Sequence, residues 1–91
     1  MQHRTSELGK LYELQQANKH LDKLVFDVTS ILEFHIKCNE SLPIDVDVKL
    51  SSNVKDKDLN YVLEQLKVLG VHAVIKEKSE YRLVVKVIEL D

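Results

Sequence analysis

The sequence predicts an α+β domain in which a long N-terminal helix is followed by a β-α-β-β unit with a small three-stranded, mostly antiparallel sheet. Two observations predict this class: a helical pattern over residues 6–37, and a second helical pattern set among strand-like segments in residues 44–90. At 91 residues, with 44% hydrophobic and 31% charged content, the chain fits one globular domain spanning residues 1–91.

The first element is the helix predicted over residues 6–37. Leucines and β-branched residues recur there at intervals of three or four, and Gly9 is the only helix-weak residue. Ser6 is suited to cap the N-terminus. A polar run and Pro43 follow Lys37, so we expect the helix to end there, because a residue before proline is disfavoured in the α region.

The β-α-β-β unit begins with a strand whose apolar and polar residues alternate from Ile44. A second helix follows, with Ser52 or Asn53 as candidate N-caps and Gly70 as the left-handed residue at its end. Residues 72–76 and 81–90 are expected to form an antiparallel hairpin. The last strand is the richest in Val, Ile and Leu, so we place it in the centre of the sheet, beside the first strand.

A helix of about 30 residues is roughly 45 Å long, which is more than a three-stranded sheet covers. Its apolar residues also fit a heptad pattern, with an Asn at one a position, a device that sets register and strand number in coiled coils. We therefore expect self-association as a homodimer or higher oligomer through the long helix. The predicted interface residues are Leu11, Leu14, Asn18, Leu21, Val25 and Val28.

The alternative is that this heptad pattern is an ordinary amphipathic stripe that packs within one subunit. Over three heptads, periods of 3.5 and 3.6 residues differ little, so the pattern does not decide between the two arrangements. Phe26 and Phe34 lie among charged residues on another side of the helix and suggest a second contact surface.

The last strand suggests a surface for another, unidentified protein. If Leu83, Val85 and Val87 face the core, the alternating residues form an amphiphilic opposite face. The residues of this predicted partner surface are Arg82, Val84, Lys86 and Ile88.

A weak nucleic-acid-binding protein is the alternative function, using basic side chains of the C-terminal hairpin. These are Lys76, Lys78, Arg82 and Lys86. The net charge of −2 and the neighbouring acidic residues count against this function.

No catalytic, cofactor or metal site is predicted. His35 and Cys38 share a helix face but supply only two of the four ligands that structural zinc requires. The two glycines, Gly9 and Gly70, cannot form a glycine-rich phosphate loop. Because the remaining carboxylates and histidines are dispersed, we expect a non-enzymatic protein that binds no cofactor.

The single cysteine excludes an internal disulfide, and no segment resembles a signal peptide or a membrane span. We therefore expect a cytoplasmic protein without membrane contact. The predicted function is a small protein–protein interaction protein, of the adaptor, inhibitor or assembly-subunit kind, which self-associates through its long helix.

Overall fold

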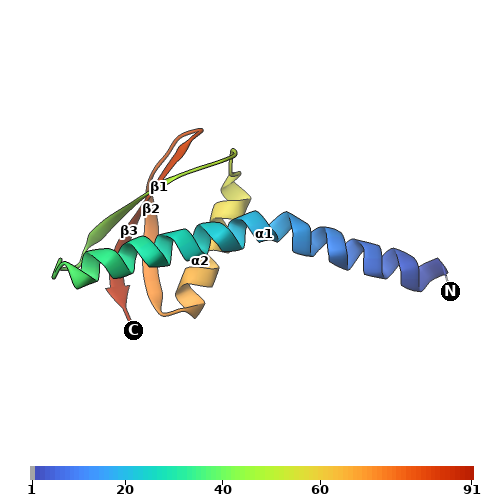
Figure 1. Ribbon diagram of the computed structural model, residues 1–91, viewed down its shortest axis with the longest axis horizontal. Coiled ribbons are helices and arrows are strands. Elements are labelled where there is room, and N and C mark those ends of the chain that lie inside the picture. The colour runs from blue at the N-terminus through green and yellow to red at the C-terminus, as the bar shows by residue number, and fades with distance from the viewer. Residues whose placement is uncertain (1) are drawn as a thin grey trace.

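A computed structural model describes the backbone of residues 2–91 and the side chains of residues 19–91. It confirms the predicted α+β class and the order α-β-α-β-β (Figure 1). The elements are α1 (Gln2–Lys37), β1 (Ile44–Lys49), α2 (Asp56–Val68), β2 (Val71–Lys78) and β3 (Arg82–Leu90).

The three strands form one sheet in the order β1-β3-β2, with β3 antiparallel to both neighbours. The central position predicted for the last strand is therefore confirmed. Val46 of β1 and Ile75 of β2 both pair with Val85 of β3, so these three side chains share the core face. Irregularities between His72 and Ala73 and between Ile75 and Glu77 shift the register of β2 against β3.

Helix α1 begins at Gln2, so Ser6 lies inside the helix and does not cap it. It ends at Lys37, as the sequence predicts. Asn39 adopts a left-handed backbone with φ of 63°, a conformation that asparagine tolerates well at a helix end. The N–H of Asn39 donates to the carbonyl of Ile36 at 2.9 Å, which satisfies one of the last carbonyls of the helix.

Helix α2 begins at Asp56, which is later than the predicted N-caps Ser52 and Asn53 would place it. Its N-cap is Lys55, whose backbone N–H donates to the carboxylate of Asp58 at 3.4 Å. Val54 and Leu59 flank this start and are both buried, which is the spacing of a hydrophobic staple. Burial of Val54 therefore determines where the helix starts. At the other end, Gly70 has a φ of 83° and supplies the predicted left-handed residue.

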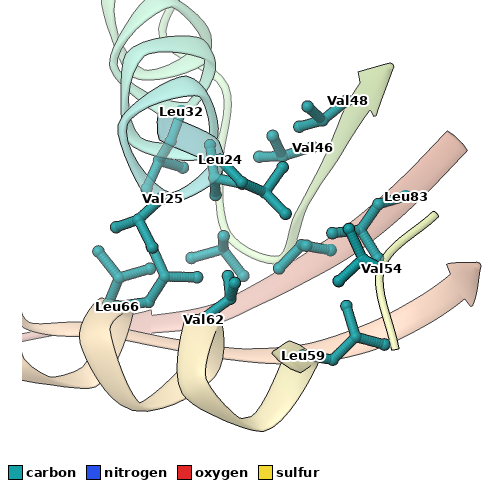
Figure 2. Close-up of a cluster of buried hydrophobic side chains, with 14 of the residues drawn as sticks. Leu24, Val25, Leu32, Val46, Val48, Val54, Leu59, Val62, Leu66 and Leu83 are labelled. Atoms are coloured by element: carbon teal, nitrogen blue, oxygen red, sulfur yellow. The ribbon is translucent and has the colours of Figure 1, made fainter. Parts of the chain in front are cut away.

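The core lies between the sheet and one layer of two helices, in which α1 packs on β1, α2 packs on β2, and the helices contact each other (Figure 2). Tyr61 of α2 joins the helices at the surface, where its hydroxyl donates to Oδ1 of Asp22 at 2.7 Å. This hydrogen bond to a carboxylate raises the pKa of Tyr61 above its ordinary value of 10.0. The core residues are Leu21, Leu24, Val25, Val28, Leu32, Ile44, Val46, Val48, Leu50, Val54, Leu59, Val62, Leu66, Val71, Leu83, Val85 and Val87.

Helix α1 is much longer than the layer that it helps to form. Its 36 residues correspond to about 54 Å, and the longest dimension of the chain is 56 Å. Figure 1 shows the N-terminal half of α1 extending away from the sheet and α2. Only the C-terminal half of this helix is therefore covered by the domain.

Candidate interaction surfaces

The predicted helix interface divides into two parts. Leu21, Val25 and Val28 are 2%, 7% and 0% exposed and belong to the core of their own chain. These three residues therefore pack within one subunit, as the alternative interpretation of the heptad pattern, an ordinary amphipathic stripe, predicts. Leu11, Leu14 and Asn18 lie outside the side chains that the structure describes, although the helical backbone runs through all three positions. The structure therefore bears only on the second half of the predicted interface, from Leu21 to Val28.

Phe26 and Phe34, which suggested a second contact surface, are 68% and 65% exposed. The ring of Phe34 lies edge-on to the ring of His35, with 6.4 Å between the ring centroids. Neither phenylalanine belongs to the core cluster. They remain two exposed aromatic side chains on the half of α1 that packs on the domain.

The face of the sheet opposite the helices carries the predicted partner surface. Arg82 and Lys86 lie there, paired in the strand register with Lys49 and Asp45 of β1, and Ile88, at the register irregularity between β2 and β3, is 52% exposed. Val84 pairs with Asp47 and Glu77, which share this face, yet it is only 6% exposed and stands outside the core cluster. Polar neighbours cover Val84. This face therefore exposes fewer apolar side chains of β3 than the alternation of residues along that strand predicts.

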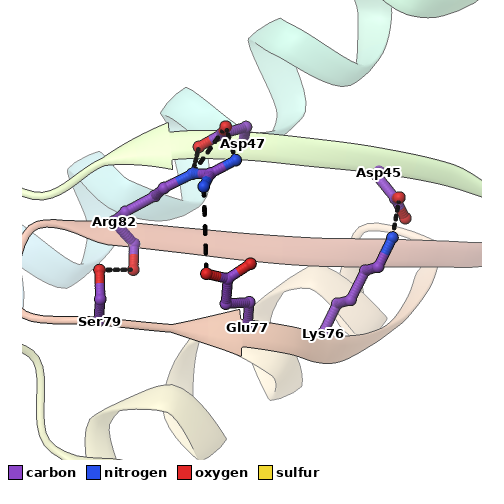
Figure 3. A network of polar contacts seen from close by, with 6 residues as sticks. All are labelled: Asp45, Asp47, Lys76, Glu77, Ser79 and Arg82. Carbon is purple, nitrogen blue, oxygen red and sulfur yellow. Dashed lines mark hydrogen bonds and ion pairs between the residues drawn. The ribbon is translucent and has the colours of Figure 1, made fainter.

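Ion pairs connect all three strands across this face (Figure 3). Nε of Arg82 donates to both carboxylate oxygens of Asp47 at 2.9 Å, and its Nη1 lies 4.0 Å from Glu77. Lys76 of β2 reaches over β3 to Asp45 of β1. Strand alternation alone puts Asp45 and Asp47 on one face of β1. Their pairing with residues 31 and 35 positions away becomes visible only once the strand order is known.

These contacts also bear on nucleic-acid binding. Of the four basic residues considered for it, Lys76 and Arg82 are paired as above, and Lys78 lies 3.7 Å from Asp56. Among the described side chains, Lys86 alone of the four has no ion-pair partner. Phosphate contacts would have to displace these carboxylates, so the arrangement disfavours a polyanion on this face.

The Asp47–Arg82 contact predicts a pH-dependent stability. Hydrogen bonding to the Arg82 guanidinium lowers the pKa of Asp47 below its ordinary value of 3.8. A carboxyl whose pKa is lower in the folded state stabilises the fold above its unfolded pKa, and this contribution is lost as the pH falls through the folded pKa. The stability difference between wild type and Asp47→Asn should therefore be largest at pH values well above 3.8 and shrink as the pH falls through the lowered pKa of Asp47.

Urea unfolding of both proteins at pH 6 and at low pH measures this difference. The matched control is the Arg82→Gln background, in which Asp47→Asn should have little effect at either pH. A wild-type advantage that stays constant with pH would show that the ion pair does not stabilise the fold.

A groove of about 340 Å³ lies at the C-terminal ends of α1 and α2. Its apolar lining comes from Leu32 and Ile36 of α1, Leu69 after α2, Val71 of β2 and Leu90 of β3. Ile36 and Leu69 are 42% and 61% exposed, and the neighbouring Val68 is 78% exposed. Exposed apolar side chains around a recess are typical of protein contact surfaces. The sequence does not reveal this groove, because its residues come from elements that are far apart in the chain.

His35 and Cys38 do not form a site with a third group. The ring of His35 faces Glu40, and Cys38 is an exposed free cysteine. Among the side chains that the structure describes, no three His, Cys, Asp or Glu residues gather closely enough to hold a metal ion. In residues 2–91 neither helix has an apolar stretch suited to crossing a bilayer.

Comparison of the chain with protein-family models, with curated proteins and with solved structures returned no match. The function is therefore inferred from the residues and geometry of the chain itself.

Proposed function

We propose that this chain is a non-enzymatic interaction protein that forms a homodimer through the N-terminal half of α1. The observation that carries the proposal is that this half of the helix extends beyond its own domain (Figure 1). Gln2 lies about 28 Å along the helix from Leu21, the first core residue that the structure describes.

The sequence of this helical half supports the proposal. Leu11 and Leu14 continue, toward the N-terminus, the heptad spacing of Leu21, Val25 and Val28. Short helices without packing partners are marginal in water, and Gly9 weakens this one by about 1 kcal/mol relative to alanine. A second copy of the helix would supply the apolar contacts that stabilise it.

The dimer would leave the remaining surfaces of both domains free for another protein. We propose the groove between Ile36 and Leu69 as the surface for this partner, because it combines exposed apolar residues with a recess. The open face of the sheet is a weaker candidate, since its charges are largely paired with one another. Adaptor, inhibitor and assembly-subunit roles all fit such a protein.

Leu14→Asp tests the proposal. Loss of a buried leucine costs about 2–5 kcal/mol and each dimer would lose two, so the dissociation constant should rise by about 100-fold or more. Sedimentation velocity at increasing protein concentration measures the change. The domain should still unfold cooperatively in urea, because the core residues of α1 that the structure describes begin at Leu21 and do not include position 14.

Gln16→Asp is the matched control for this variant. It introduces the same charge half a turn along the same helix, at an f position of the heptad that points away from the proposed interface. The molar mass of this variant in solution should equal that of the wild type. If both variants keep the wild-type dimer, the interface does not lie at Leu14.

A further inference from the structure

We infer that the two copies of the chain associate with their α1 helices antiparallel, so that the two domains lie at opposite ends of the dimer. This inference rests on the proposed self-association and adds its geometry. It follows from how one side of α1 is shared between the domain and the partner.

The a and d positions of the heptad pattern lie along one side of the helix. From Leu21 to Leu32 these positions are occupied by core residues, including Val25 and Val28, which pack against the sheet and α2 of the same chain. An α-helix drifts by about 20° per heptad relative to a 3.5-residue repeat. Positions 11 and 14 therefore lie within about 40° of the side on which the domain sits.

A parallel pair conflicts with this arrangement. Two parallel helices in contact at Leu11 and Leu14 would continue side by side through Leu21 and Val28. Packed helix axes lie only 8–10 Å apart, and at Leu21 and Val28 that space already holds the sheet and α2 of each chain. A parallel seam would thus place the helix of one copy inside the domain of the other.

An antiparallel pair confines the conflict to about one helical turn. With Leu11 of one copy facing Leu14 of the other, the two helices overlap over residues 2–23, and Leu21 faces position 4 of the second copy. From residue 24 onward, the helix of the second copy runs past the N-terminal end of α1, and Figure 1 shows that end extending away from the domain. The rest of each domain then lies beside its own helix, clear of the second copy.

The apolar positions also indicate the register. Facing a and d positions alternate in an antiparallel pair, so Leu11 of one copy packs against Leu14 of the other, and the twofold axis passes between residues 12 and 13. In this register Asn18 faces Glu7 of the second copy, at both ends of the leucine cluster. The amide of Asn18 is able to donate a hydrogen bond to that carboxylate.

The native cysteine provides the test. Cys38 is exposed, follows directly after α1, and is the single cysteine of the chain, so a spin label attaches there without mutation. The antiparallel register places the two Cys38 residues about 75 Å apart, whereas parallel helices would hold them within about 20 Å. Double electron–electron resonance on the labelled protein separates these distances.

A second label pair gives a positive signal for the antiparallel arrangement. Protein labelled at Cys38 is mixed with a Thr5→Cys/Cys38→Ser variant labelled at position 5, so that each copy carries one label. Across the two copies the labels should be about 27 Å apart in the antiparallel dimer and about 50 Å apart in a parallel one. Sedimentation of the labelled samples verifies that they are dimers.

The outcomes separate the two proposals. Dimers with the short distance between position 5 and Cys38 support the antiparallel arrangement. Dimers with two Cys38 labels in close proximity contradict it but leave self-association standing. A sample that is monomeric by sedimentation and shows no distance between labels on different copies overturns both self-association and the antiparallel arrangement.

Discussion

Leu21→Asp is expected to unfold the domain. Leu21 is 2% exposed and belongs to the core. Removing it costs about 2–5 kcal/mol, and an unpaired carboxylate at the same position adds a desolvation cost of several kcal/mol. Domains of this size are stable by about 5–15 kcal/mol in total, so most or all of that stability is lost. Far-ultraviolet circular dichroism and urea unfolding measure the effect.

Ser30→Asp is the matched control for this variant, because it introduces the same charge at an exposed position of α1. It is expected to change stability by less than about 0.5 kcal/mol. If Leu21→Asp unfolded with the wild-type midpoint, Leu21 would not be a core residue of its own chain. The division of α1 into a domain half and a partner half would then be incorrect.

Leu66→Ala is expected to lower the free energy of unfolding by about 2–5 kcal/mol. Leu66 is 0% exposed and projects from α2 into the centre of the core (Figure 2). Truncation removes its contacts and leaves a cavity that the surrounding valines and leucines fill only in part. For a domain of this length the melting temperature should fall by at least about 8 °C.

Leu69→Ala provides the comparison, because it removes the same atoms from a side chain that is 61% exposed. Its effect should stay within about 0.5 kcal/mol. Calorimetry on the two variants under the same conditions gives both values. Equal losses of stability would contradict the placement of α2 against the sheet.

The sequence predicted the element order, the central position of the last strand and the left-handed residue Gly70. These features depend on local signals, namely apolar periodicity and glycine placement. The boundary of α2 depended instead on a tertiary contact, since burial of Val54 moves the start of the helix past Ser52 and Asn53.

The interaction surfaces were less predictable because they join residues that are far apart in the chain. The contacts between Lys76 and Asp45 and between Arg82 and Asp47 depend on strand order and register. They also explain why Val84 is covered. Similarly, periodicity alone indicated an apolar side on the long helix, but not that Leu21 and the residues after it pack on the helix's own domain.

Self-association through the N-terminal half of α1 is the central claim, and sedimentation equilibrium of the wild-type chain over a wide concentration range tests it most directly. The claim predicts that the molar mass rises with concentration to twice the chain mass of 10.5 kDa. A mass that remains at 10.5 kDa at every concentration would contradict it.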